Sequence, residues 1–188
     1  MFLNIRQVEN TKDAEDVKKK MREGAPKGEK EILNFISTLV FRQVPVWVGM
    51  VGDEPVTVNG TYFEKRKRDV WGPYANAYTA FTRIDLRRKG YARELNNYVR
   101  EKAVEAGCMR WKALTGSRLG IYFHQAFGDQ FWCLNDRQMM VVDTPLVDAS
   151  RFPLDQTPAS ASRWTTRTTP LTPEELEVLL REPLYYEQ

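Results

Sequence analysis

The sequence predicts a mixed α/β fold, because segments with the pattern of β-strands alternate with segments that have the pattern of amphipathic helices. Residues 75–84 are rich in aromatic and β-branched side chains, which is typical of a strand. Residues 92–106 carry apolar side chains at every third or fourth position, which is typical of a helix with one buried face. The chain of 188 residues is long enough for a substantial core. We assign one domain to residues 1–143 and an extension to residues 144–188.

A short strand and two helices are predicted near the start of the chain. The strand covers residues 2–8, and Thr11 can cap a helix that runs to Met21 and ends within residues 23–26. This first helix has only a small apolar side, so we expect it on the surface. The second helix, at residues 31–41, should face the core with its apolar side chains, which are Ile32, Phe35, Ile36, Leu39 and Val40.

A β-hairpin is predicted next, and a basic loop follows it. Residues 46–51 and 55–63 form the strands, and residues 52–54 have the composition of a turn. The basic run at residues 65–68 is flanked by acidic residues, and the net charge of the chain is only +3. A solvated loop is therefore favoured for this run, and a nucleic-acid patch is the alternative.

The second half of the domain continues the alternation of strands and helices. After the helix at residues 92–106, Gly107 is expected at the C-terminal cap. A strand at residues 109–114 follows, and then a short helix after Ser117. Two strands, at residues 131–134 and 138–142, close the domain around a polar turn.

The composition changes after residue 143. Pro, Ser and Thr dominate residues 144–170, which is typical of an irregular segment that runs over a surface. Residues 172–175 then have the pattern of a capping box with Pro173 at the first helical position. An apolar stripe follows, made of Leu176, Leu179 and Leu180. We expect this helix to fold back onto its own domain, and the alternative is an arm that binds a partner protein or a second copy of the chain.

The few cysteines and the single histidine argue against a metal site, and the distribution of apolar residues argues against a secreted or membrane-spanning protein. The two cysteines form no CxxC pair, and the single histidine cannot complete a zinc cluster with them, so no metal site is predicted. We expect Cys108 and Cys133 to be buried and reduced, as in a cytoplasmic protein. The chain shows neither the pattern of a secretory signal nor an apolar stretch that could span a membrane. Four tryptophans are expected in the core, namely Trp47, Trp71, Trp111 and Trp132.

The loop between the strand at residues 75–84 and the following helix has the features of a phosphate-binding cradle. It reads Arg87, Arg88, Lys89, Gly90, Tyr91 and Ala92. The N–H groups and the positive dipole end of the first helical turn favour an anion. Gly90 would let the backbone approach that anion closely, and the three cations add charge-assisted contacts. The alternative is a helix start with a solvated basic turn.

With its elements in this order, the chain resembles the GCN5-related N-acetyltransferase (GNAT) superfamily, as a divergent member, over residues 2–143. The motif that carries the resemblance is Arg/Gln-x-x-Gly-x-Gly/Ala, which here runs from Arg87 through Gly90 to Ala92. The resemblance implies an α+β variant of the α/β fold, with a mixed, mostly antiparallel central sheet flanked by about four helices. It also implies an acyltransferase that moves an acetyl group from acetyl-CoA directly to an amine.

The resemblance further implies which residues hold acetyl-CoA. Backbone N–H groups of residues 88–92 would bind the pyrophosphate, and the neighbouring cations would supply charge. The edge of the preceding strand would pair with the pantetheine arm through Phe81, Thr82 and Arg83. One N–H group there would polarise the thioester carbonyl. Ser117 stands nearest to the Asn with which this family often opens the next helix, and it is assigned to the cofactor as well.

Two residues are candidates for proton transfer. The amine must lose a proton before it attacks, because an alkylammonium group has a pKa of about 10.4, and the CoA sulfur must gain one as it leaves. Tyr122 and His124 can do this chemistry. Family members often carry a Tyr four residues before a Gly, and counting back from Gly128 places His124 at that position. Asp85 and Glu64 lie near the presumed site, but surface solvation is favoured for both.

Three functions follow from these observations. The favoured one is N-acetyltransferase activity toward a primary amine of a small molecule or a protein. The second is a GNAT-like protein, with or without CoA, that acts by binding another protein, which the departures at Ser117 and His124 and the long extension favour. The chain also resembles acetyltransferase-like proteins encoded by bacterial viruses, some of which act on host proteins. The third is nucleic-acid binding through residues 65–68, which predicts a steep salt dependence.

Overall fold

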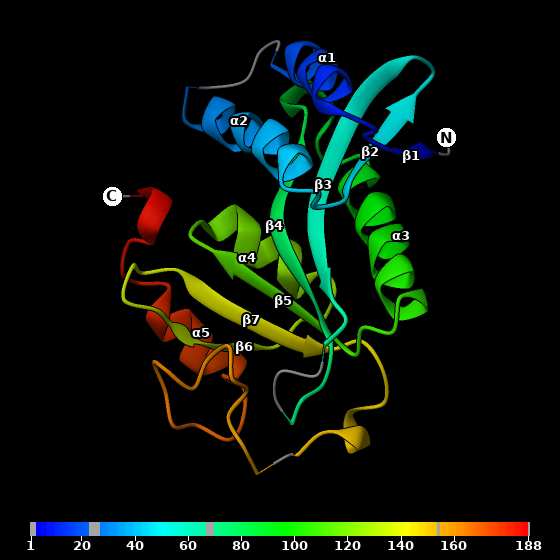
Figure 1. Ribbon diagram of the computed structural model, residues 1–188. Coiled ribbons are helices and arrows are strands. Elements are labelled where there is room, and N and C mark those ends of the chain that lie inside the picture. The colour runs from blue at the N-terminus through cyan, green and yellow to red at the C-terminus, as the bar shows by residue number, and fades with distance from the viewer. Residues whose placement is uncertain (1–2, 23–26, 67–69, 154, 188) are drawn as a thin grey trace. The chain divides into compact units, whose positions relative to one another are not determined.

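The computed structural model describes residues 3–22, 27–66, 70–153 and 155–187, with the side chains of all of these except residues 27–32 and 187 (Figure 1). Several sequence predictions fall outside this part of the chain. They are the strand position Phe2, the end of the first helix at residues 23–26, the basic residues Lys67 and Arg68, and the core position of the Ile32 side chain.

The predicted order of strands and helices is confirmed. The elements are β1 (Asn4–Gln7), α1 (Thr11–Met21), α2 (Lys27–Phe41), β2 (Val46–Val51), β3 (Glu54–Glu64), β4 (Tyr74–Thr82), α3 (Tyr91–Glu105), β5 (Arg110–Thr115), α4 (Arg118–Gln125), β6 (Phe131–Leu134), β7 (Met140–Pro145) and α5 (Pro173–Leu179). Short 3-10 helices cover Ile84–Leu86, Ala149–Arg151 and Tyr185–Glu187. Within the described residues, no helix combines the length and the hydropathy needed to cross a bilayer.

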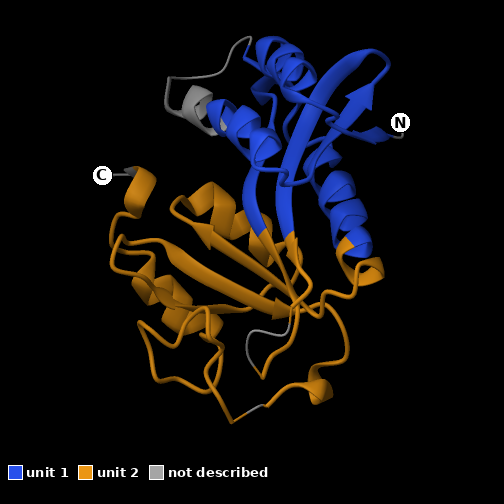
Figure 2. Cartoon of the chain, in the orientation of Figure 1, with its two compact units in different colours: residues 1–62, 77–102 blue, residues 63–76, 103–188 orange. Residues whose placement is uncertain are grey.

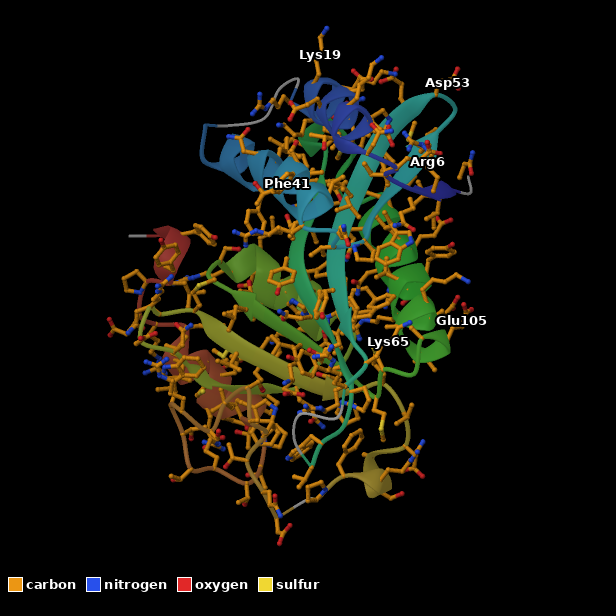
Figure 3. The ribbon with its side chains drawn as sticks, viewed as in Figure 1. Arg6, Lys19, Phe41, Asp53, Lys65 and Glu105 are labelled. Carbon is orange, nitrogen blue, oxygen red and sulfur yellow. The ribbon has the colours of Figure 1, made fainter. Side chains whose placement is uncertain are left out.

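The strands form one seven-stranded sheet in the order β1-β2-β3-β4-β5-β7-β6. The pairs β1–β2, β2–β3, β5–β7 and β6–β7 are antiparallel. The hairpin predicted from the turn at residues 52–54 is confirmed, with Val51 opposite Glu54 and a left-handed φ of 60° at Gly52. Asp53 lies at the tip of this hairpin (Figure 3). The fold class predicted from the sequence, a mixed α/β fold with a mostly antiparallel sheet, is therefore confirmed.

The chain divides into two compact units, each with its own core (Figure 2). Unit 1 consists of residues 1–62 and 77–102, and unit 2 consists of residues 63–76 and 103–188. Strands β3 and β4 and helix α3 each contribute residues to both units.

Unit 1 has a core between its helices and its strands that is aliphatic except for Phe81. Helices α1 and α2 lie side by side (Figure 1), and Lys18 Nζ lies 3.1 Å from Ser37 Oγ. Although α1 is strongly polar, its small apolar side is fully used, because Ala14, Val17 and Met21 are all buried in this core. The N-cap of α1 is Asn10 and not Thr11 as predicted. Asn10 has the extended backbone of a cap, and its side chain accepts a hydrogen bond from Asp13 N at 3.0 Å.

Unit 2 has an aromatic core to which the C-terminal extension contributes. Trp71 stacks on Phe152 at a centroid distance of 5.5 Å and meets Trp132 edge-on at 6.1 Å. Ala161 is buried in the same cluster. The four tryptophans predicted for the core are all buried, and so are both free cysteines. Burial raises the pKa of the Cys108 thiol to about 11, so Cys108 is a neutral core residue near neutral pH.

A buried ion pair also holds unit 2 together, and the sequence patterns did not predict it. Arg110 Nη1 lies 3.1 Å from Asp143 Oδ2, and both side chains are shielded from solvent. The guanidinium of Arg110 lies over the ring of Trp71 at 5.6 Å. From the extension, the Ser160 hydroxyl donates a hydrogen bond to the same Asp143 carboxylate oxygen. The extension is therefore bonded to the centre of unit 2.

The end of the extension folds back on its own unit, as predicted. The capping box at the start of α5 is confirmed by the paired hydrogen bonds of Thr172 and Glu175. Arg167 holds the Glu175 carboxylate with both terminal nitrogens, at 2.7 and 2.9 Å. Farther along, Tyr186 N donates to Gly116 O at 2.9 Å, at the junction of β5 and α4.

Candidate functional site

The loop between β4 and α3 in unit 1 has the strand–loop–helix geometry predicted for a phosphate cradle. Strand β4 ends at Thr82, and α3 begins at Tyr91. Between them, Arg87 is extended, and both Arg88 and Gly90 have left-handed backbones, with φ of 63° and 86°. Gly90 adopts this conformation without steric cost, whereas a non-glycine residue such as Arg88 does so rarely. A turn with this backbone can direct successive N–H groups into a concavity that binds an anion.

The start of α3 provides hydrogen-bond donors to this loop. The first backbone bond of the helix runs from Glu94 N to Gly90 O at 3.0 Å. The N–H groups of the first helical turn, before Glu94, are not used by the i→i−4 hydrogen bonds of the helix, as at every helix N-terminus. A Cβ atom added at Gly90 would meet nothing within 4 Å. The space beside the backbone at this position is open, as close approach of an anion requires.

The basic residues around the cradle differ in their surroundings. Arg88 and Lys89 are exposed. Arg87 is half-buried, because its Nε donates to Thr82 O at 3.1 Å and its guanidinium lies over the Phe81 ring. Arg83 is paired with Asp85 at 2.9 Å. Arg88 and Lys89 are thus the cradle cations that solvent and a ligand can reach most directly.

At the end of β4, the backbone groups of successive residues are directed alternately toward β3 and away from it. Arg83 N donates to Val56 O at 3.0 Å, and Phe81 O accepts from the Thr57 hydroxyl at 3.1 Å, so residues 81 and 83 turn these groups toward β3. Because successive residues of a strand direct their backbone groups to opposite edges, the N–H of Thr82 is directed away from β3. Of the three residues predicted to pair with a pantetheine arm, Thr82 has this orientation.

The two carboxylates near the predicted site have different environments. Asp85 is exposed, as expected, and its hydrogen bond with Arg83 lowers the pKa of its carboxyl group. Glu64 was expected on the surface, but only 3% of it is exposed, and it accepts a hydrogen bond from Arg66 N at 3.0 Å. The expectation for Glu64 was wrong because its strand, β3, continues to that residue and carries its side chain into unit 2.

The three remaining predicted site residues belong to α4 in unit 2. Ser117 is the N-cap of α4, and its hydroxyl accepts from Gly120 N at 3.2 Å. Tyr122 is 58% exposed. His124 is only 7% exposed, and its Nδ1 lies 2.6 Å from Asp129 Oδ2. The structure thus groups these residues on one short helix, and it groups the predicted cradle residues in unit 1.

Asp129 was not singled out from the sequence. Its carboxylate is fully shielded from solvent and contacts the imidazole directly. A local signal was present, because Asp129 follows the single histidine by five residues and comes directly after Gly128, at the end of a helical pattern. Gly128 adopts a left-handed φ of 68°, which turns the chain back toward His124. Among the described residues, no group of three His, Cys, Asp or Glu side chains is arranged to hold a metal ion.

Comparison with sequences and with structures gave different results. No family model and no curated protein matches the sequence. An acetyltransferase from Thermus thermophilus is similar in structure, with a TM-score of 0.62 and 17% identity over 77% of this chain and 97% of that one. A putative GNAT-family acetyltransferase from Desulfovibrio desulfuricans has a TM-score of 0.61 and 13% identity, over 77% and 99% of the two chains.

A third similar structure contains a bound cofactor, CoA. It is an acetyltransferase from Bacillus subtilis in complex with CoA, with a TM-score of 0.58 and 17% identity over 77% of this chain and 99% of that one. Each neighbour is matched over nearly its whole length, so the shared part is a complete domain. The chain therefore has the GNAT fold, as its sequence predicted.

Proposed function

We propose that this protein is an acetyl-CoA-dependent N-acetyltransferase that acts on a primary amine of a small molecule or a protein. The observation that carries the proposal is the cradle at the start of α3, with its left-handed Arg88 and Gly90 in a GNAT fold. The Bacillus subtilis neighbour that is in complex with CoA supports the choice of cofactor.

The residues of the cradle fit a pyrophosphate group. The N–H groups of residues 88–92 would bind its oxygens, because they belong to the loop and to the first turn of α3. Arg88 and Lys89 would add charge from the exposed side of the loop, and Arg87 would add it from a more buried position. The open space beside Gly90 would admit the phosphate oxygens.

The end of β4 would orient the acyl group. Acetyl-CoA, when bound, supplies an acetyl group that is activated as a thioester. The N–H of Thr82, which is directed away from β3, would donate a hydrogen bond to the pantetheine arm or to the thioester carbonyl oxygen. Phe81 and Arg83 would hold this part of the strand in place through their bonds to Thr57 and Val56.

Two side chains of α4 would handle protons. His124 can take a proton from the acceptor amine and pass one to the leaving sulfur, and the phenol of Tyr122 can donate one. Tyr122 is exposed, whereas His124 is held by a buried carboxylate, so they offer two distinct environments for the same task. Ser117 would contribute to the cofactor site from the N-terminus of the same helix.

The proposal is tested first by calorimetry with acetyl-CoA. We expect the unmodified protein to bind and Gly90→Ala to bind more than about tenfold more weakly, because a Cβ would fill the space that the phosphate needs. Gly107→Ala is the matched control, because Gly107 has a φ of 88°, ends the same helix and also has open space at its Cβ position. Both variants should lose a similar amount of stability, about 1 kcal/mol.

The second step is an assay of CoA release with a panel of primary amines. Binding without release would leave the alternative of a GNAT-like protein that acts by binding a protein partner or a second copy of the chain. The exposed Tyr185 and Tyr186 at the end of the extension support that alternative. If the unmodified protein does not bind acetyl-CoA at millimolar concentration, or if Gly90→Ala and Gly107→Ala bind equally well, the cradle is wrongly assigned.

A further inference from the structure

The turn after α4 brings a carboxylate directly against the only histidine of the chain. The helix ends at Gln125, and the chain then folds back, so that Phe127 N and Asp129 N both donate to His124 O, at 3.0 and 3.1 Å. Gly128 allows this turn through its left-handed backbone. The backbone of residue 129 is thus fixed to the backbone of residue 124 before the side chains meet.

The side chains complete the arrangement. Asp129 Oδ2 lies 2.6 Å from His124 Nδ1, the carboxylate is shielded from solvent, and the imidazole is nine-tenths buried. The ring of Phe123 packs edge-on against the imidazole at 5.5 Å. An ionised carboxylate only accepts hydrogen bonds, so Nδ1 must carry the hydrogen. Within the part of the chain that the structure describes, no group hydrogen-bonds Nε2 of His124.

We infer that Asp129 is a positioning residue that holds His124 with the hydrogen on Nδ1 and the lone pair on Nε2, so that a single imidazole can carry a proton from the acceptor amine to the leaving sulfur. This inference rests on the proposed acetyltransferase function and assigns one of its two proton-transfer candidates. The carboxylate also stabilises the imidazolium that exists between the two proton transfers.

The step balances for an acceptor that arrives as the neutral amine, after its ammonium form has released one proton to the solvent. As the acceptor nitrogen bonds to the acyl carbon, Nε2 takes one proton from that nitrogen. The carbon–sulfur bond breaks with its electron pair going to sulfur, and Nε2 then gives the same proton to the sulfur. The imidazole returns to its starting form, and Asp129 stays ionised throughout. Tyr122 is not needed in this sequence.

A purely structural histidine is the competing interpretation, because the pair also ties the end of α4 to the start of β6. The two interpretations differ in what they require of Nε2. A structural pair needs only the contact at Nδ1 and tolerates any neutral replacement that keeps it. A proton carrier also needs the lone pair on Nε2, and it fails when the hydrogen moves to that atom.

The first test is nitrogen NMR of the unmodified, histidine-labelled protein at alkaline pH. Because the chain has one histidine, the spectrum has one imidazole and needs no assignment. We expect the form with hydrogen on Nδ1. The form with hydrogen on Nε2, or an even mixture of the two, would overturn the inference, and this measurement needs no variant to fold.

The second test compares Asp129→Asn with Asp136→Asn, which changes an exposed carboxylate of the same unit. The Asn amide can donate to Nδ1, which moves the ring hydrogen to Nε2. We expect Asp129→Asn to lower kcat by about a hundredfold or more, to leave acetyl-CoA affinity within about twofold, and to shift the NMR signal. Asp136→Asn should change none of these quantities.

The outcomes separate this inference from the proposed function. If the unmodified protein acetylates an amine and Asp129→Asn keeps kcat within about twofold, Asp129 has no positioning role, whereas the acetyltransferase function stands. If the unmodified protein neither binds acetyl-CoA nor releases CoA, both proposals are wrong.

Discussion

Unit 1 and unit 2 position their candidate functional groups by different physical means. In unit 1, the proposed ligand contacts are backbone N–H groups of the cradle, which is shaped by left-handed residues at positions 88 and 90. In unit 2, the candidate group is a side chain, His124, that a buried carboxylate holds. A site made of backbone tolerates many side-chain changes as long as its φ and ψ angles survive. A site made of one side-chain pair fails with a single substitution.

The ion pairs of the two units show the same contrast. In unit 1, Arg6 and Asp13 meet at 2.6 Å with 40% and 20% of their side chains exposed. In unit 2, the side chains of Arg110 and Asp143 meet at 3.1 Å with 0% and 1% exposed. Exposed pairs contribute little to stability, whereas breaking a buried pair leaves a charge in a poorly solvating interior. Unit 2 should therefore be far more sensitive to the loss of one polar side chain.

The largest effect is expected from Asp143→Ala. This change removes the carboxylate that the buried Arg110 guanidinium contacts at 3.1 Å, and it also removes the acceptor of the Ser160 hydroxyl. We expect a loss of about 3–5 kcal/mol in the free energy of unfolding, measured by urea denaturation. The double variant with Arg110→Met and Asp143→Leu should recover most of this loss. A loss below about 1 kcal/mol for Asp143→Ala would mean that the buried pair does not distinguish unit 2.

A smaller effect is expected from Gly116→Ala, which tests how the extension is attached to unit 2. The new Cβ would lie 2.9 Å from Tyr186 Cδ2 and 3.0 Å from Tyr185 Cβ, so the end of the chain must shift. We expect a loss of about 1–3 kcal/mol and faster hydrogen exchange at the amides of Tyr185 and Tyr186, which bond Gln138 O and Gly116 O. Gly52→Ala, in the hairpin of unit 1, should leave the exchange at these two amides unchanged.

A modest effect on binding is expected from Arg88→Asn, which separates backbone from charge in the cradle. Asn tolerates the left-handed conformation of position 88 but carries no charge. We expect acetyl-CoA affinity to fall by about three- to tenfold, less than for Gly90→Ala, and to depend less on salt. Lys19→Asn, on the exposed side of α1, is the charge control (Figure 3). A larger loss for Arg88→Asn than for Gly90→Ala would show that charge, and not backbone shape, dominates the cradle.

The smallest effect is expected from Asp13→Asn, and it should depend on pH. The hydrogen bond with Arg6 lowers the pKa of the Asp13 carboxyl group below its ordinary value of 3.8. The folded state therefore favours the ionised form, and this stabilisation is present above pH 4 and is lost as the pH falls through the lowered pKa. At pH 7 the variant should be less stable by at most about 1 kcal/mol, and the difference should shrink toward pH 2. A difference that stays constant across this range would contradict the ion-pair explanation.

Local sequence patterns predicted much of the fold and part of the candidate site. The turn at Gly52 and the capping box at Thr172 are confirmed, as is the C-terminal cap of α3, where Gly107 N bonds Val104 O. The cradle was predicted from local sequence as well, because a glycine between a strand pattern and a helix pattern marks a position where the backbone can turn through a left-handed conformation. The cap of α1 was misplaced by one residue, since Asn10 and Thr11 are both good caps and only the backbone distinguishes them.

The sequence by itself determined the order of the elements, the turn at Gly52, the cap at Gly107 and the capping box of α5, because these depend on residues that are close in the chain. Only the tertiary structure decided the burial of Glu64, the pairing of Arg110 with Asp143 and the contact of Tyr186 with Gly116. These features join residues that are distant in sequence, and burial and charge pairing depend on such neighbours and not on local propensity. The pair of His124 and Asp129 lies between the two cases, since the turn at Gly128 is local, whereas the burial that gives the pair its chemistry comes from the packing of the whole unit.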